Sequence, residues 1–289
     1  MLVQDIFKQL DREWVLELFT KAQNEKWTLL KLCLEYFSIT QDKEFKIYLE
    51  SCIIDDKKTR KSNTGITGDL VEWMITGDRK TSSEKPDLLD YGLDIDVKCL
   101  SFFEGILTEK LSLTSVSWEG KKALRYTKFE DSNIFSKKKL LVPKFSEELN
   151  GTHKVTKNGN LSKVKGKTVY HMNRIFIGFQ YVDLNILLDR AKQDYIYYQN
   201  TVIEKGEHYV CYKLGSGQYR FDSLGNIQFQ RNPVDRSQVL HKKQAGNGKK
   251  QAKDRIIEGK IQKTYPQKWN IGVEVMMNYF FLEFGKVRI

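Results

Sequence analysis

The first sixty residues place apolar side chains between charged ones at helix-like intervals. This spacing is typical of one buried face of an α-helix, and it is carried by Phe7, Leu10, Trp14 and Leu18, and again by Leu29, Leu32, Leu34 and Phe37. We therefore predict that residues 1–60 form a helical N-terminal part of the chain.

A short and mostly apolar segment, Asp69–Ile75, predicts a further helix. Thr67 is expected to cap its first turn, because a hydroxyl oxygen there can accept from a free backbone N–H. Gly77 is expected to end it, because glycine readily adopts the left-handed conformation that follows many helices.

Strands and helices then follow one another without a clear linker or repeat. The segments expected to be strands are residues 93–98, 111–118, 139–142 (stopped by Pro143) and 174–181. The other segments are a helix over 182–198, a basic loop or irregular hairpin over 146–168, a hairpin over 208–221 and an apolar helix or strand over 273–284. This interleaving predicts one α/β domain whose two lobes face a cleft.

Composition adds the expectation of a polyanionic partner. The chain has 289 residues, of which 40% are hydrophobic, so it can fill a core. Lysine and arginine outnumber the acidic residues by 48 to 37, which gives a formal net charge of +11. An excess of this kind favours binding to phosphate-rich partners such as nucleic acid, although many basic proteins bind none specifically.

The cysteines and the apolar segments indicate a cytoplasmic protein that does not enter a membrane. The four cysteines form no Cys-x-x-Cys pair, which favours reduced thiols over disulfides or a zinc site. We find no signal-peptide pattern at the start and no stretch approaching the roughly 20 apolar residues of a membrane span.

The most informative segment is residues 85–98, which join an acidic turn to a charged strand. Asp87 lies in the turn, and the strand ends with Asp96, Val97 and Lys98. Strand side chains alternate between faces, so Asp94, Asp96 and Lys98 are expected to share one side. Two carboxylates beside an ammonium can hold Mg²⁺ against a phosphodiester and present a water to it. The pattern indicates a nuclease centre.

Each part of this pattern also has a simpler explanation. A charged strand face can be the solvated side of an edge strand, and Pro86-Asp87 is ordinary turn chemistry. Glu72 lies within the apolar helix between Val71 and Trp73. A carboxylate held near a core is costly unless it is paired or bound to a cation, but Glu72 can equally point outward from an amphipathic helix.

Three elements together carry a family resemblance: residues 68–73 (Gly-Asp-Leu-Val-Glu-Trp), residues 85–87 (Lys-Pro-Asp), and Gly92 leading into an acid-x-lysine strand. In this order they resemble the MutH-type mismatch-repair endonucleases and the GATC-cutting type II restriction enzymes of the PD-(D/E)xK nuclease superfamily. The similarity extends to Ser132–Lys137, where those enzymes carry a further active-site lysine. It is strong over 62–143 and weak elsewhere.

The resemblance implies a restriction-endonuclease-like fold, with a mixed β-sheet flanked by helices and two lobes around a DNA cleft. It implies one nuclease domain over 1–289. Residues 1–60 would be its helical part, 62–143 its catalytic core, and 144–289 a second half that carries DNA-reading loops.

One departure from the family pattern concerns the second acid. The family has one acid between the glycine and the lysine, whereas this chain has both Asp94 and Asp96 before Lys98. Only Asp96 has the required two-residue spacing to Lys98, so we assign the metal role to Asp96 and keep Asp94 as a rival ligand.

The roles that follow from the resemblance and the chemistry centre on Mg²⁺. Asp87, Asp96 and the carbonyl of Val97 would ligate the ion, and Glu72 would hold a second ion directly or through water. Lys98 would orient or deprotonate the attacking water. Lys137 would add positive charge near the scissile phosphate, unless it is one lysine of a solvated run.

Residues 241–255 form a basic, glycine-containing segment that suits contact with double-stranded DNA. Its lysines suit phosphates, and its amide side chains can hydrogen-bond base edges. The candidate DNA-binding residues are Lys242, Lys243, Gln244, Asn247, Lys249 and Lys250, with Tyr265 beyond the segment. The alternatives are a solvated charge run and, for Tyr265 and Trp269, a place in the core.

We therefore expect a Mg²⁺-dependent type II restriction endonuclease that leaves 5′-phosphates, with GATC-like sites as its family's usual target. Cutting both strands of a palindrome requires two active sites, hence a homodimer on DNA. The alternatives are a mismatch-repair nicking enzyme and a catalytically inert DNA-binding module.

Overall fold

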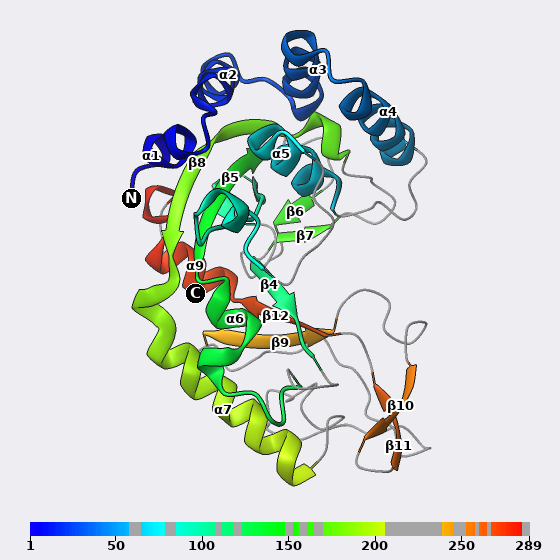
Figure 1. Cartoon of the computed structure of the whole chain (residues 1–289), viewed down its shortest axis with the longest axis vertical. Helices are drawn as coiled ribbons and strands as arrows, with labels where there is room; N and C mark the ends of the chain where they lie inside the picture. The colour runs from blue at the N-terminus through cyan, green and yellow to red at the C-terminus, as the bar shows by residue number, and fades with distance from the viewer. Residues whose placement is uncertain are drawn as a thin grey trace. The chain divides into compact units, whose positions relative to one another are not determined.

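The structure is a computed structural model that describes residues 1–57, 65–78, 85–103, 105–107, 111–117, 123–147, 153–155, 161–163, 170–205, 239–244, 253–257, 260–264 and 267–284. It is a mixed α/β structure, as the sequence predicts (Figure 1). The chain divides into two compact units. Unit 1 comprises Met1–Glu109, Lys139–Asp183 and Phe280–Ile289, and unit 2 comprises Lys110–Lys138 and Leu184–Tyr279. This division does not test the expectation of one nuclease domain.

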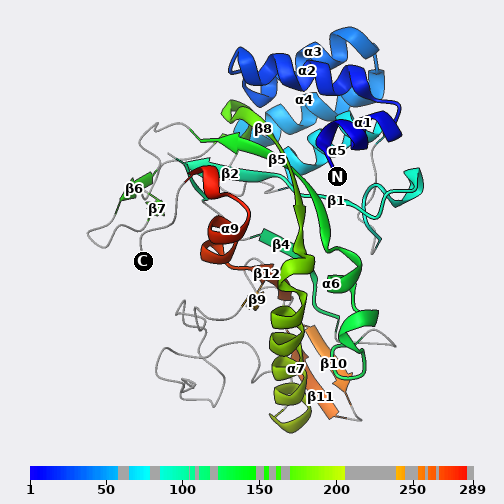
Figure 2. The ribbon, with the colours of Figure 1, turned by 90° about the vertical axis from the view of Figure 1, so that its left-hand side faces the viewer.

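Unit 1 begins with the predicted helical part. Its helices are α1 (Val3–Gln9), α2 (Glu13–Asn24), α3 (Leu29–Thr40), α4 (Lys43–Lys57) and α5 (Ile66–Thr76). They lie together on one side of the strands of this unit (Figure 2). The apolar positions that predict α1 and α2 include Phe7, Leu10 and Leu18, which are all buried. The helical prediction for the N-terminal part is therefore confirmed.

The ends of α5 differ in part from the prediction. Gly77 ends the helix in the left-handed conformation, with φ +82°, as expected. Thr67 lies inside the first turn instead of capping it, and the N-cap is Gly65. The hydroxyl of Thr67 is instead engaged by Nδ1 of His171 at 3.3 Å and by the Arg174 guanidinium at 3.5 Å.

The sheet of unit 1 is mixed, with β5 at its centre. Its strands are β1 (Asp96–Val97), β2 (Leu100–Phe103), β3 (Ile106–Leu107), β5 (Lys139–Ser146) and β8 (Ile175–Asp183). Strands β1 and β2 run parallel to β5 along one of its sides, and β8 runs antiparallel along the other. β3 pairs with β2 in antiparallel fashion.

Pro143 does not stop β5, so this part of the prediction is wrong. Asp96 and Val97 pair with Leu140 and Leu141, and the next pairing, of β2, begins at Lys144. Pro143 thus falls between the two pairings. Because proline has no N–H to donate to a neighbouring strand, it fits a position in the ladder where neither β1 nor β2 is paired.

The core of unit 1 joins the helices to the sheet through aromatic side chains. Phe19 of α2 contacts Phe176 and Phe179 of β8 at ring distances of 4.9 and 4.8 Å. Phe7 of α1 contacts Phe179 at 5.2 Å, and Phe145 of β5 contacts Phe176 at 5.6 Å. These contacts fix the sheet against the helical layer. Buried side chains of α5 belong to the same hydrophobic core.

Two further elements of unit 1 concern the other predictions. β6 (His153–Val155) and β7 (Leu161–Lys163) form an antiparallel pair, which is the irregular hairpin expected over 146–168. The strand expected over 174–181 is β8.

Unit 2 is built on a second sheet and a long helix. Its strands β4 (Leu111–Ser115), β12 (Gln267–Ile271) and β9 (Leu240–Gln244) pair in that order, and β10 (Lys253–Ile257) pairs with β11 (Lys260–Thr264). The helices are α6 (Asn133–Ser136), α7 (Leu188–Lys205) and α9 (Val273–Tyr279). Asp194 of α7 accepts from the backbone N–H groups of Val239 and Leu240 at 2.8 and 2.9 Å, which ties β9 to the helix.

The remaining predictions fall in unit 2 or outside the described residues. The helix expected over 182–198 is present as a 3₁₀ turn, Leu184–Leu187, followed by α7. The segment after residue 273 is helical rather than extended. The hairpin expected over 208–221 lies outside the described residues. None of the helices that the structure describes combines the length and the apolar character needed to cross a membrane.

Replacing Gly68, within α5, and Gly77, which follows its last residue, is expected to change stability in opposite directions. A Cβ at Gly68 would meet nothing within 4 Å, so Gly68→Ala is expected to raise the free energy of unfolding by roughly 0.5–1 kcal/mol through the lower backbone entropy of the unfolded chain. Gly77→Ala is expected to lower it by about 1–2 kcal/mol, because Gly77 has a positive φ. Its Cβ would also lie 1.6 Å from Nη2 of Arg12.

Urea-induced unfolding of both variants beside the wild-type protein measures these changes. The described conformation of α5 is contradicted if Gly77→Ala is as stable as Gly68→Ala.

Candidate active site

The turn that carries Asp87 is fastened to the start of β1 by its own backbone. The N–H of Leu88 donates to the carbonyl of Ile95 at 3.0 Å, and the N–H of Val97 donates to Oδ2 of Asp87 at 2.8 Å. Gly92 reverses the chain between them with φ +77°. A left-handed residue is needed there, and glycine adopts this conformation at the least cost. Asp87 therefore has a defined position beside β1.

Burial along the charged segment separates the two rival acids. Asp96 is fully buried, with 0% of its surface exposed, whereas Asp94 is exposed. The neighbours Ile95 and Val97 are also buried. The interpretation of this segment as a solvated edge is therefore wrong for Asp96 and fits Asp94.

Lys98 brings the predicted metal ligands together around one positive charge. Its Nζ lies 2.6 Å from Oδ2 of Asp96 and 3.7 Å from Oδ2 of Asp87, and it donates to the carbonyl of Val97 at 3.1 Å. These three oxygen-bearing groups are the ones that the sequence proposes as ligands of a cation. The geometry thus assembles Asp87, Asp96, Val97 and Lys98 at one point (atoms of unit 1 alone).

Glu72 reaches the same electrostatic environment from α5. Its side chain is only partly exposed, although Leu70, Val71, Trp73, Met74 and Ile75 around it are buried. Burial and the neighbouring Asp87 raise the pKa of Glu72 to about 7, while Lys98 opposes the increase. Glu72 is therefore affected by the charges of Asp87 and Asp96 and is not on a freely solvated helix face. We call Glu72, Asp87 and Asp96 the carboxylate cluster.

The pKa values of Asp87 and Lys98 are raised as well. Burial raises the pKa of Asp87, and the Asp96 carboxylate adds to this effect, against the opposing influence of Lys98 and of the Val97 N–H. Burial alone would lower the pKa of Lys98, but the carboxylates of Asp96 and Asp87 outweigh it and raise the pKa. Two carboxylates, those of Asp87 and Asp96, thus lie within 4 Å of one ammonium group, and the side chain of Glu72 is affected by the same charges.

This donor set suits a hard divalent cation. Mg²⁺ prefers oxygen ligands, and it is commonly held by one or two carboxylates while it keeps several waters. Asp87, Asp96 and the Val97 carbonyl offer two carboxylates and one peptide oxygen. Across the residues with described positions, no group of three or more His, Cys, Asp or Glu side chains is assembled to hold a metal, so Glu72 is not a third carboxylate of a preformed site.

Lys137 is described within the other unit. It follows α6 and is buried, with 6% of its surface exposed, which contradicts the interpretation of a fully solvated lysine. Because Lys137 belongs to unit 2 and the carboxylates belong to unit 1, its predicted role near the scissile phosphate stays a prediction.

The predicted DNA-binding residues are described only in part. Lys242, Lys243 and Gln244 lie on β9, where backbone pairing with β12 is described but their side chains are not. Asn247, Lys249, Lys250 and Tyr265 lie outside the described residues. In β12, the exposed Lys268 stands opposite Lys243 in the strand register, a basic pair that the sequence alone did not single out.

Trp269 belongs to the core of unit 2. It is 3% exposed and contacts the rings of Tyr195 and Tyr198 at 5.5 Å each. The core interpretation of this tryptophan is confirmed.

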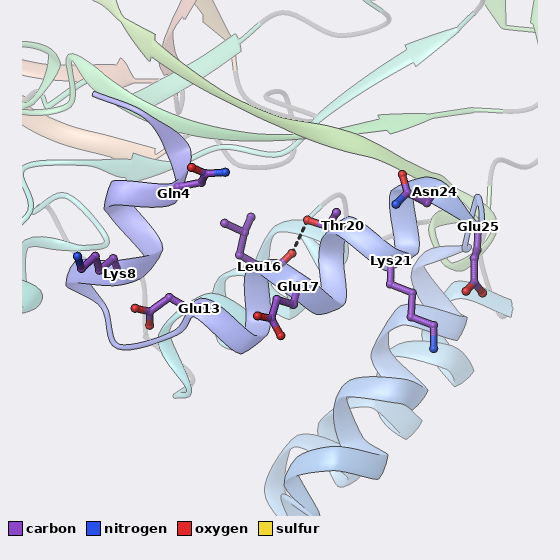
Figure 3. A pocket seen from close by; sticks show the side chains of 9 residues that line it. All are labelled: Gln4, Lys8, Glu13, Leu16, Glu17, Thr20, Lys21, Asn24 and Glu25. Carbon is purple, nitrogen blue, oxygen red and sulfur yellow. Dashed lines mark hydrogen bonds between the residues drawn. The ribbon is translucent and has the colours of Figure 1, made fainter.

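A hollow lined by residues of α1 and α2 and by the residue that follows α2, Glu25, contains none of these charges. It measures about 650 Å³ and is lined by side chains of both charges and polar groups, among them Lys8, Glu17 and Lys21 (Figure 3). None of the residues that line it belongs to the carboxylate cluster.

No family model matches this chain, and no curated protein matches it either. The functional interpretation therefore depends on the residues and their geometry.

The raised pKa of Glu72 predicts a pH dependence of stability. A carboxyl group whose pKa is higher in the folded state favours folding fully below its unfolded pKa, near 4.5, and this contribution is lost as the pH rises through about 7. Glu72→Gln is always neutral, so it should gain about 1–3 kcal/mol over the wild-type protein between pH about 5 and about 8.

Denaturant unfolding at several pH values, with a chelator present, measures this difference. Taking the difference between the two proteins removes the contributions of groups that titrate alike in both; it keeps the mutual effect of Glu72 and Asp87. Parallel stability curves would show that Glu72 is not near the other carboxylates.

Proposed function

We propose that this protein is a Mg²⁺-dependent endonuclease that hydrolyses phosphodiester bonds of double-stranded DNA. The observation that carries the proposal is the convergence of Asp87, Asp96 and the Val97 carbonyl on the single cationic atom Nζ of Lys98. The net charge of +11 supports a polyanionic substrate.

In this proposal, Asp87, Asp96 and the carbonyl of Val97 would hold the ion, and a bound Mg²⁺ would supply Lewis-acid chemistry at the phosphate. The Nζ of Lys98 now contacts all three of these groups, so it would have to move for a cation to bind there. The side chain of Lys98 is long enough for its ammonium group to remain beside Asp96 and to hydrogen-bond the attacking water or a phosphate oxygen.

The electrostatics refine the role of Lys98. Its pKa is raised, so it keeps its proton at neutral pH while both carboxylates are its partners. A protonated lysine orients water and stabilises negative charge on phosphorus.

Glu72 supplies the remaining chemistry at the cluster. With a pKa near 7, its carboxyl group can hold or release a proton at the working pH. It can also hold a second ion directly or through water. Lys137 adds positive charge near the scissile phosphate in the same proposal.

The finer architecture belongs to the proposal as well. We take the mixed sheet around β5 as the core of a restriction-endonuclease-like fold with two lobes around the DNA. The basic strand pair of β9 and β12, with Lys243 opposite Lys268, would contact the nucleic acid together with residues 245–255. Such an enzyme is expected to act as a type II restriction endonuclease, with two copies on a palindromic site such as GATC.

Replacement of single charges tests the catalytic assignment. Asp96→Asn and Lys98→Ala are each expected to reduce DNA cleavage in Mg²⁺ by at least about 10³-fold, because each removes a group held at the reacting centre. DNA binding in Ca²⁺ should persist. Asp94→Asn is the matched control. It removes an equal charge from an exposed position that lies two residues before Asp96.

Cleavage of labelled duplex DNA and binding by fluorescence anisotropy give the two readouts. Full activity of both Asp96→Asn and Lys98→Ala refutes the nuclease assignment at this cluster. Loss of activity in Asp94→Asn alone would make Asp94 the ligand.

A second prediction separates the two kinds of endonuclease. On unmethylated supercoiled plasmid with Mg²⁺, the purified protein should give discrete double-strand fragments with 5′-phosphate ends. Slow nicking without linear product supports a repair enzyme instead. DNA binding without any cleavage supports an inert binding module, and sequencing of the fragment ends identifies the site.

A further inference from the structure

Helix α5 is fixed near both ends, with Glu72 between them. Near its first turn, the carbonyl of Thr67 accepts from the thiol of Cys99 at 3.8 Å, next to Lys98. At its last residue, the carbonyl of Thr76 accepts from the hydroxyl of Tyr91 at 2.9 Å and from the Arg12 guanidinium at 3.3 Å. Carbonyls in the last turn of a helix have no partner within the helix, so these donors satisfy one of them.

Tyr91 belongs to the turn that carries Asp87. It ends the short 3₁₀ helix Leu89–Tyr91, and its N–H donates to the carbonyl of Leu88 at 3.1 Å. Asp87 lies four residues before Tyr91 and is itself held by the N–H of Val97. One tyrosine therefore joins the segment that bears Asp87 to the helix that bears Glu72.

We propose that Tyr91 is a positioning residue that sets the separation of Glu72 from Asp87 through its hydrogen bond to the Thr76 carbonyl. This inference depends on the proposed function for its effect on catalysis, but the geometry it describes does not. We assign Tyr91 a positioning role and not a catalytic one, because its hydroxyl donates to the end of the helix.

The physical effect follows from the electrostatics of the cluster. Glu72 lies on α5 and Asp87 lies in the turn that contains Tyr91, so a change in the spacing of these two segments changes the separation of the two carboxylates. Without the hydroxyl, α5 and the turn remain in contact through the ring but lose the bond that fixes their spacing. Small displacements of reacting groups are costly in catalysis.

Tyr91→Phe is the test, and Tyr48→Phe is its matched control. The hydroxyl of Tyr48 also donates to α5, to Oδ2 of Asp69 at 2.8 Å, and its ring stacks on Trp73 at 5.7 Å. It makes this contact on an exposed side chain of the helix and not at its C-terminal end. Both variants thus remove one hydroxyl that donates to the same helix.

The first readout needs neither metal nor DNA. Amide hydrogen exchange of Val97, whose N–H donates to Asp87, should become about fivefold faster in Tyr91→Phe and stay unchanged in Tyr48→Phe. The Leu240 amide, bonded to Asp194 in unit 2, serves as an internal reference that neither variant should change.

The second readout connects the tether to the proposed reaction. The dissociation constant for Mg²⁺, measured by calorimetry without DNA, should rise severalfold in Tyr91→Phe. The kcat for DNA cleavage should fall by about tenfold with little change in KM. A merely structural role would lower stability without separating kcat from KM.

The outcomes distinguish the two proposals. Equal Val97 exchange in Tyr91→Phe and Tyr48→Phe overturns the role of Tyr91, whether or not the protein cleaves DNA. Faster Val97 exchange in a protein whose wild-type form neither binds Mg²⁺ nor cuts DNA supports the tether and refutes the nuclease proposal. Faster exchange with lower Mg²⁺ affinity and lower kcat supports both.

Discussion

The cluster depends on the charge balance around the ammonium group of Lys98. Asp96 is fully buried, and an isolated carboxylate at such a position would carry a large desolvation penalty. Lys98 offsets that penalty at 2.6 Å, and Asp87 and the Val97 carbonyl complete its surroundings. The same arrangement keeps the carboxylates close together in the absence of any other cation.

Local backbone chemistry explains why these charges can meet. In the turn that carries Asp87, the N–H of Leu88 donates to the carbonyl of Ile95, and the N–H of Val97 donates to the carboxylate of Asp87. Backbone groups at the start of β1 therefore position this acid. The strand in turn is held by β5, and β5 by the aromatic contacts between β8 and the N-terminal helices. The helical layer that the sequence predicts most simply is therefore the support of the site.

The sequence predicted most of the elements and the proximity of Asp87, Asp96 and Lys98. Helical spacing identified α1 to α3 and α5, and the Asp87–Lys98 segment identified the residues that the structure brings together. The spacing rule also favoured Asp96 over Asp94, in agreement with their burial. These successes share a cause, since both periodicity and short-range spacing are local properties of the chain.

The failures concern interactions between distant parts of the chain. Thr67 has the chemistry of a helix cap, but His171 and Arg174, more than a hundred residues away, engage its hydroxyl. The sequence does not distinguish Tyr91 from other aromatic residues. The bond of its hydroxyl to the end of α5 is seen when the chain is folded. Proline often ends a strand, but the effect of Pro143 depends on whether a neighbouring strand pairs at that position of β5. Because β1 and β2 bond to separate stretches of β5 on either side of this proline, different backbone pairings hold the strand that bears Asp96 and the strand that follows it.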